Sequence, residues 1–438
     1  MRTERARERG PDPGRIAGGE ATCPEEPETY RLSEGNEVIE RAVVLRAGGS
    51  ARTRIRVGQA KLLDSFEESL ADHFDREFLG AAIRPKVKPN SPDIRLVDLF
   101  SGCGAMSLGI WEAARAVGAR VAPIMALDSN RAALRVYEAN FPGVWPVSEA
   151  VESILDGALG APASSSERHL VRRLGRVDML VGGPPCQGHS NLNNYTRRSD
   201  PKNVLYDRMA RFAELVRPKH VIIENVPAVL HDKGKVVDRT VAHLRHLNYH
   251  IDNAVVEALA VGVPQRRRRH FVVASRDHQP DICGTVAAFA RRERSVTWAI
   301  GDLARVKRTR VFDQPSAPSR VNSERIEYLF NEKLFELPDD RRPDCHRLAK
   351  HSYTSVYGRL RPDRPAQTIT SGFLSMGQGR YVHPTQRRTI TPHEAARLQF
   401  IPDFFDFEGV PNRTALAEMI GNAVPPKLAY ILGVDLLR

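Results

Sequence analysis

The chain has 438 residues, of which 41% are hydrophobic, so it can bury a large core spread over two or three domains. Its 65 lysine and arginine residues against 53 aspartate and glutamate residues give a formal net charge of +12, which favours a polyanionic partner such as a nucleic acid. No apolar run reaches the roughly 18 residues of a membrane span, and the charged N-terminus does not resemble a signal peptide. We therefore expect a soluble, cytoplasmic protein with no membrane partner.

The cysteines show neither a CxxC pair nor the spacing of metal ligands. This pattern argues against a disulfide framework and against a zinc site, so we expect a reduced compartment and no bound metal. The five residues concerned are Cys23, Cys103, Cys186, Cys283 and Cys345.

The N-terminal part of the chain divides into two segments. Residues 1–35 are rich in Arg, Glu, Gly and Pro with little apolar periodicity, which predicts a disordered leader. Residues 36–90 form an extension whose role the sequence does not reveal. Within it, the pattern between Glu37 and Val57 predicts two strands around a Gly-Ser turn, and the spacing from Ala60 to Phe78 predicts a helix.

Regular alternation of apolar runs with helical spacing begins near Ile94. The apolar runs IRLVDLF, APIMALD, VDMLVGG, HVIIENV and HFVVAS are typical of strands buried on both faces. Stretches such as AALRVYEANF and RMARFAELVR lie between them and have the spacing of amphipathic helices. This alternation predicts an α/β fold with a doubly wound, mostly parallel sheet.

The alternation stops between about residues 280 and 355, where Arg, Pro and charged residues dominate. We expect a smaller inserted domain over residues 291–372, within an α/β domain that comprises residues 91–290. Helical periodicity returns in TPHEAARLQF and ALAEMIGNAVPPKLAYILG, so residues 373–438 should pack back on the sheet and complete that domain.

A glycine-rich turn follows the first of these strands, in the run from Phe100 to Gly104. In a doubly wound sheet, such a turn lets a nucleotide-like ligand approach the backbone closely. Asp128 ends the next strand, where an acid can accept hydrogen bonds from ribose hydroxyls. Ser107 replaces the third glycine of a GxGxxG motif and no P-loop lysine follows, so a pyrophosphate site is not indicated.

Two further strand ends carry reactive side chains. Pro184 and Pro185 fix the backbone before Cys186, and flanking glycines permit sharp turns, so the thiol is presented at a strand end. An arbitrary cysteine is more often a small buried hydrophobe, but this setting favours a nucleophile. Glu224 leaves an apolar strand, where desolvation would raise the pKa of its carboxyl group and allow it to donate a proton near neutrality.

A run of arginines precedes the strand HFVVAS. Alternate residues of an extended segment share a face, so Gln265, Arg267 and Arg269 should point together, whereas Arg266 and Arg268 should face solvent. Guanidinium groups on the first face would suit a phosphate or a base oxygen.

The motifs DLFSGCG, GGPPCQGHS, ENV, QRRRR and IGNAVPP occur in this order between about Ile94 and the C-terminus. As a set they resemble the bacterial cytosine carbon-5 DNA methyltransferase family. RPDRPAQTITSG further resembles the segment that frames the family's recognition domain. The resemblance implies a Rossmann-like methyltransferase fold, S-adenosylmethionine as the cofactor and double-stranded DNA as the substrate.

The resemblance also assigns roles to individual residues. Cys186 would add to ring carbon 6 of a flipped-out cytosine, and Glu224 would hold and protonate ring nitrogen 3. Arg269 would contact the base oxygen and a nearby phosphate, with Arg267 supporting the loop. The cofactor would be held by Phe100, Ser101, Gly102, Cys103, Gly104, Asp128, Ser129, Asn422 and Ala423.

The chain departs from the family pattern around the cofactor. Ala105 stands where many members have a third glycine, and Asp128 stands where a glutamate is common. Ser129 replaces the usual apolar residue that packs on the adenine, so stacking would fall mainly to Phe100. Either Glu149 or Glu152 could contact the adenine amine.

The resemblance further implies that the polar loop from Gln187 to about Asn203 closes over the DNA and that the inserted domain reads its major groove. Two alternatives remain: an RNA cytosine carbon-5 methyltransferase, and a non-catalytic DNA-binding regulator. We expect a monomer associated with the nucleoid, and the sequence leaves open both the DNA site and a companion restriction or defence protein.

Overall fold

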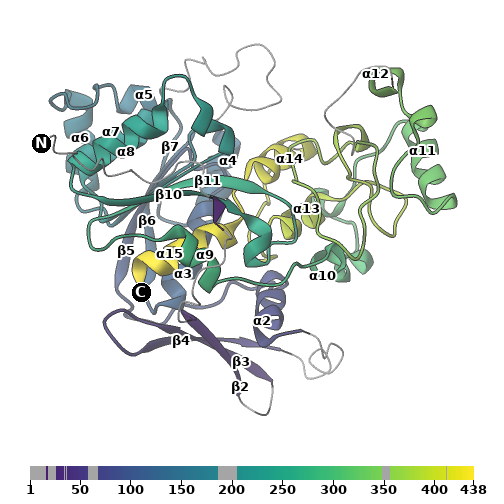
Figure 1. Cartoon of the computed structure of the whole chain (residues 1–438), viewed down its shortest axis with the longest axis horizontal. Coiled ribbons are helices and arrows are strands. Elements are labelled where there is room, and N and C mark those ends of the chain that lie inside the picture. The colour runs from purple at the N-terminus through teal and green to yellow at the C-terminus, as the bar shows by residue number, and fades with distance from the viewer. Residues whose placement is uncertain are drawn as a thin grey trace, which may run out of the picture.

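The computed structural model describes residues 16–17, 26–33, 35, 37–57, 68–185, 205–347, 356–410 and 412–438. An eight-stranded sheet has the order β1-β10-β11-β9-β8-β5-β6-β7 (Figure 1). Neighbouring strands are parallel except where β11 meets β10 and β9. The strands are β1 (Ile16–Ala17), β5 (Asp93–Leu99), β6 (Arg120–Leu127), β7 (Trp145–Val147), β8 (Met179–Gly182), β9 (His220–Asn225), β10 (His250–Glu257) and β11 (Arg268–Ser275).

Helices cover both faces of this sheet, as a doubly wound fold requires. Successive strand residues point to opposite faces, so Ile222 packs in one apolar core while its neighbours Val221 and Ile223 pack in the other. One face is covered by α3 (Ala105–Ala116), α4 (Arg131–Asn140), α9 (Ile282–Ala288) and α15 (Pro426–Leu437). The other is covered by α5 (Val151–Ile154), α6 (Ser165–Leu174), α7 (Leu205–Val216) and α8 (Val236–His246).

The predicted mostly parallel α/β fold is present, with one strand that departs from the strand-helix alternation. The run HFVVAS forms β11, which is antiparallel to both of its neighbours. β10 was not predicted from the sequence, and it is joined to β11 by a short connection that contains the 3-10 helix Ala258–Val261. A connection of that length permits only antiparallel pairing, because parallel pairing needs a crossover of a dozen residues or more.

Residues 291–372 divide their apolar side chains between two cores. The segments around Val296 and Ile369 belong to the large core on the sheet. A separate small core contains Ile326, Leu329, Leu337, Val356, Tyr357, Met376 and Val382. Figure 1 shows this part of the chain to one side of the sheet. Its helices, with those that follow, are α10 (Val296–Ile300), α11 (Arg320–Asn331), α12 (Asp344–Arg347), α13 (Pro392–Leu398) and α14 (Arg413–Asn422); short 3-10 helices span Pro227–His231, Asp302–Arg305, Val311–Asp313, Asp339–Arg341 and Met376–Gln378.

The N-terminal extension is a three-stranded antiparallel sheet of β2 (Glu28–Ser33), β3 (Val38–Val44) and β4 (Ser50–Arg56), joined by α2 (Leu70–Leu79). The two strands expected around a Gly-Ser turn are confirmed as β3 and β4, with Gly48 and Gly49 at positive φ. The expected helix is found only as α2, which begins after a capping box at Ser69, and residues 58–67 lie outside the described chain.

The expectation of a wholly disordered leader over residues 1–35 is wrong for two segments. β2 pairs with β3, and β1 pairs in parallel with β10. β1 is hydrogen-bonded to β10, which lies far along the chain, and β2 is hydrogen-bonded to β3, which lies outside residues 1–35. Composition alone does not predict such pairing.

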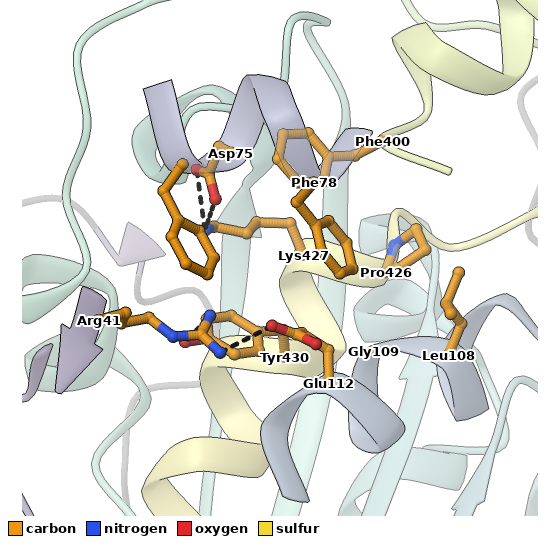
Figure 2. A pocket seen from close by; sticks show the side chains of 11 residues that line it. Arg41, Asp75, Phe78, Leu108, Gly109, Glu112, Phe400, Pro426, Lys427 and Tyr430 are labelled. Carbon is orange, nitrogen blue, oxygen red and sulfur yellow. Dashed lines mark hydrogen bonds and ion pairs between the residues drawn. The ribbon is translucent and has the colours of Figure 1, made fainter. Parts of the chain in front are cut away.

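Buried ion pairs join the extension to the main domain (Figure 2). The Arg41 guanidinium lies 2.7 Å from a Glu112 carboxylate oxygen on α3, and the Lys427 ammonium lies 2.9 Å from Asp75 on α2. Arg294 reaches the same Asp75 at 2.8 Å. Pairing offsets the desolvation of these charges, so the extension is fixed to the sheet domain. A cavity at this junction is lined by Arg41, Phe74, Asp75, Phe78, Leu108, Gly109, Glu112, Phe400, Pro426, Lys427 and Tyr430.

Candidate active site

The site is built where four parallel strands end in register. Leu99 of β5 pairs with Leu127 of β6 and with Gly182 of β8, and Gly182 pairs with Ile223 of β9. The residues that follow these four therefore form one row at the carboxyl edge of the sheet: Phe100, Asp128, Gly183 and Glu224. Since neighbouring strands lie roughly 4.8 Å apart, the row brings the glycine-rich turn within about 10 Å of Glu224 along the edge.

The turn after β5 has an unusual backbone that glycine permits. Gly102 and Gly104 have φ of 52° and 93°, and Phe100 also has a positive φ of 58°. A Cβ atom on Gly104 would lie 2.8 Å from the Tyr137 ring, so this position excludes a side chain on steric grounds as well. A Cβ on Gly102 would meet nothing within 4 Å, which leaves the backbone of the turn open to an approaching ligand.

Asp128 holds this turn in place. One carboxylate oxygen accepts a hydrogen bond from the Gly102 backbone N–H at 2.8 Å, and the other accepts one from the Asn130 N–H at 2.8 Å. Each oxygen retains a second lone pair, so the carboxylate can also accept hydrogen bonds from hydroxyl groups. Ser129 is exposed beside it, Glu149 is exposed just before α5, and Glu152 is exposed on α5.

A polar chain beneath the turn was overlooked in the sequence. The Ser107 hydroxyl donates to the buried Asp98 carboxyl group at 2.6 Å, and it also lies 2.7 Å from the Tyr137 hydroxyl. Burial raises the pKa of Asp98 to about 8. Ser101 and Cys103 of the same turn are buried. The sequence signal was a polar residue inside an apolar strand, nine residues before the serine that replaces a glycine.

Glu224 is the buried acid of the row. It is 9% exposed, and one carboxylate oxygen lies 2.7 Å from the Arg269 guanidinium. Burial raises the pKa of Glu224, and the positive charges of Arg269 and Arg267 partly offset that rise. A Cβ on Gly183 would lie 3.0 Å from the other carboxylate oxygen, so the glycine leaves room for the acid.

The described segment 68–185 ends at Pro185, the residue before Cys186. The Asn225 side-chain amide donates to the Pro184 carbonyl at 3.3 Å, which ties the Pro-Pro segment to the end of β9. Cys186 and the loop from Gln187 to about Asn203 lie outside the described residues.

The exposure of the arginine run alternates as predicted, but its inward-facing residues make different contacts. Arg266 and Arg268 are exposed, whereas Gln265 and Arg267 are almost fully buried. Arg269 forms an ion pair with Glu224, and the charge of Arg267 also lowers the pKa of that acid. Gln265, Arg267 and Arg269 therefore face inward as expected, but the first two make different contacts from Arg269.

Gln265 and Arg267 instead hold the C-terminal segments together. Arg267 donates to the backbone carbonyls of Ile369, Gly421 and Ala423 at 2.8, 3.1 and 2.9 Å. Gln265 accepts a hydrogen bond from the Ile369 N–H at 3.0 Å. Ala423 is buried in this arrangement and its neighbour Asn422 is exposed. A charged side chain satisfies three carbonyls that water cannot reach.

Comparison with known proteins identifies the class of protein that has this fold and this site at the carboxyl edge of its sheet. The family model for C-5 cytosine-specific DNA methylases matches residues 94–438, so the chain belongs to that family. It is a DNA cytosine-5 methyltransferase.

Among its relatives, the type II methyltransferase M1.BsuMI of Bacillus subtilis is 44% identical over 405 residues, covering 92% of this chain and 94% of that protein. The type II methyltransferase M.DdeI of Desulfomicrobium norvegicum is 27% identical and covers 77% of this chain and 87% of its own length. The first match extends into residues before 94, because the family region alone is shorter than 92% of the chain.

Solved structures agree on the fold. The Dnmt2 methyltransferase of S. pombe has a TM-score of 0.55 at 16% identity, covering 79% of this chain and 98% of that one. A putative DNA modification methyltransferase from an E. coli prophage has a TM-score of 0.53 at 22% identity, covering 78% and 99%. Within the described residues, no helix is long and apolar enough to cross a membrane.

Proposed function

We propose that this methyltransferase takes S-adenosylmethionine as its cofactor and transfers the methyl group to carbon 5 of a flipped-out cytosine through a covalent adduct with Cys186. The observation that carries the proposal is the row of Asp128, Phe100, Gly183 and Glu224 at one sheet edge, which places an open glycine turn near a buried acid. The motif order and the family membership support the same assignment.

The cofactor would lie over the turn from Phe100 to Gly104. The residues fit such a group, because Gly102 presents open backbone and Asp128 has lone pairs to spare for ribose hydroxyls. Phe100 and Ser129 would border the adenine, with Asn422 and Ala423 beside the turn. S-adenosylmethionine supplies an electrophilic methyl group when it is bound.

The protein's own groups would activate the cytosine. Carbon 5 is a weak nucleophile, so the Cys186 thiolate adds to ring carbon 6, and the displaced electron pair moves through the ring to carbon 5. Glu224 in its protonated form donates to ring nitrogen 3, which neutralises the charge of the adduct. After carbon 5 is methylated, its proton is lost to a base, the thiolate leaves and the aromatic ring is restored.

Arg269 would orient Glu224 and contact the base oxygen, given its 2.7 Å ion pair with that acid. Arg267 would act as a positioning residue through the carbonyls it binds. Residues 291–372 would form the target-recognition domain in the major groove, built on the small core around Ile326. The type II relatives favour a restriction-modification setting, and the DNA family model favours DNA over RNA as the substrate.

A label-transfer experiment tests the covalent mechanism. The protein is incubated with S-adenosylmethionine labelled in the methyl group and with duplex DNA or total RNA. We expect label in DNA, and none with Cys186→Ala. Label transferred to RNA alone would overturn the substrate, whereas methylation of DNA by Cys186→Ala would overturn the mechanism. Cys283→Ala is the matched control, because Cys283 lies on α9 away from the strand ends.

A further inference from the structure

The outer face of the N-terminal sheet concentrates positive charge. Residues of a strand alternate between faces, and on β4 the exposed positions are Ser50 and the three arginines Arg52, Arg54 and Arg56. Across the sheet, Arg54 pairs with Glu40 of β3, which pairs with Arg31 of β2. We call this set the basic face and define it by Arg31, Arg52, Arg54 and Arg56.

One carboxylate serves most of these arginines. Glu40 is buried, and its oxygens lie 2.6, 3.7 and 3.0 Å from the guanidiniums of Arg31, Arg52 and Arg54. The three arginine side chains nevertheless remain 63%, 56% and 57% exposed. Glu40 therefore arranges the guanidiniums, and its single negative charge is smaller than the four positive charges of the basic face.

The opposite face of the same sheet anchors it to the main domain. Ile39 and Phe74 are fully buried there, next to the ion pair between Arg41 and Glu112. Because α2 is tied to Arg294 and Lys427 by further buried pairs, the basic face is held in a fixed orientation on the enzyme. A rigid basic surface binds a polyanion with less loss of entropy than a flexible basic tail would.

We propose that the basic face binds the phosphate backbone of duplex DNA, outside the DNA segment that enters the active site. The enzyme acts on DNA, and arginine is the side chain best suited to phosphate oxygens. The extension lies outside residues 94–438, so this contact would add to the DNA binding of the catalytic region. It carries no sequence readout, because phosphates are the same at every step.

The test measures DNA binding by the full-length protein without cofactor, using a duplex of arbitrary sequence several helical turns long. Arg52→Gln with Arg56→Gln removes two charges and leaves the hydrogen bonds of Arg31 and Arg54 to Glu40. We expect weaker binding and a slope of log K against log salt that is flatter by about 1 to 2, since each phosphate contact contributes about 0.9. Glu40→Gln should strengthen binding at low salt.

Two further double variants separate charge from other effects. Arg52→Lys with Arg56→Lys should bind like the unaltered protein. Arg168→Gln with Arg172→Gln changes two exposed arginines on α6, which Figure 1 shows at the upper left, away from the N-terminal sheet at the bottom. This variant should leave the salt slope unchanged. An unchanged salt slope in Arg52→Gln with Arg56→Gln overturns the proposal. An equal loss of DNA affinity in the lysine variant or in the α6 variant also overturns it. Because no methyl transfer is measured, these outcomes are independent of the role proposed for Cys186.

Discussion

At the scale of single residues, the site depends on two acids whose pKa is raised for the same physical reason. Glu224 and Asp98 are both buried, and burial disfavours the charged carboxylate. They differ in their partners: Glu224 faces an arginine at the site, whereas Asp98 faces the hydroxyl of Ser107 below the glycine turn. In the proposed mechanism Glu224 would donate a proton, whereas Asp98 would support the glycine turn through its hydrogen bond with the Ser107 hydroxyl.

Glu224→Gln should reduce methyl transfer by about 10² to 10⁴-fold, the usual effect of losing a general acid. The proposed mechanism requires the protonated form of Glu224, so turnover should fall as the pH rises through the raised pKa of this acid. The measurement is single-turnover methylation against pH. Glu138→Gln, at an exposed position of α4, is the control. Full activity of Glu224→Gln would contradict the assignment.

Asp98 should make the free energy of unfolding depend on pH. Its pKa of about 8 in the folded protein lies above the ordinary 3.8, so between these values the folded form retains a proton that the unfolded chain has released. Stability from this group is full below pH 3.8 and is lost as the pH rises through about 8.

Asp98→Asn should flatten that dependence, as measured by urea denaturation at a series of pH values from about 5 to 9. Asp93→Asn, on the same strand but half exposed, should leave the fall in stability intact. A slope that is equally steep in Asp98→Asn would refute the account.

At the scale of elements, the C-terminal segments are held to the sheet by Arg267. Its guanidinium supplies donors to three buried carbonyls that come from two separate segments. Gly421 allows these two segments to pack closely, because a Cβ atom at this position would lie 2.1 Å from the Ser371 backbone nitrogen. The glycine of the IGNAVPP motif is therefore required for packing.

Arg267→Ala should destabilise the protein by about 3 to 5 kcal/mol, since it leaves buried polar groups without their charged partner. Arg268→Ala changes the next residue, which is exposed, and should change stability by less than about 0.5 kcal/mol. Denaturant unfolding measures both. Equal effects of the two variants would show that burial of Arg267 has no energetic consequence.

At the scale of the whole molecule, the N-terminal extension and the sheet domain share buried charges. Arg41 bridges from β3 to Glu112 on α3, the helix that begins at the glycine turn, and also donates to Tyr430 on α15 at 3.0 Å. The extension is therefore continuous with the helix that borders the proposed cofactor site. We expect the two parts to unfold in one transition.

Arg41→Ala should lower the free energy of unfolding by about 3 to 5 kcal/mol while keeping a single transition, because Glu112 would stay buried with one partner fewer. Calorimetry and circular dichroism measure the effect. Arg320→Ala, at a 92% exposed position paired with an exposed glutamate, is the control. Separate transitions for the extension and the sheet domain would contradict this prediction.

The amino-acid sequence was sufficient to predict the α/β class, the strands β5, β6, β8, β9 and β11, and the motifs at their ends. These follow from local physics: continuous apolar runs mark strands buried on both faces, and glycines mark turns that need positive φ. Asp128, Glu224 and Arg269 could be named for the same reason, since each directly follows or begins such a run.

The way in which these strands and motifs pack together could not be predicted from the sequence. Three features depend on contacts between residues that are not neighbours in the sequence. They are the antiparallel direction of β11, the pairing of β1 with β10 and of β2 with β3, and the different contacts of Arg267 and Arg269. The chain of Asp98, Ser107 and Tyr137 likewise joins a strand and two helices. Periodicity reports which face of an element is buried, but it does not report which partner buries it.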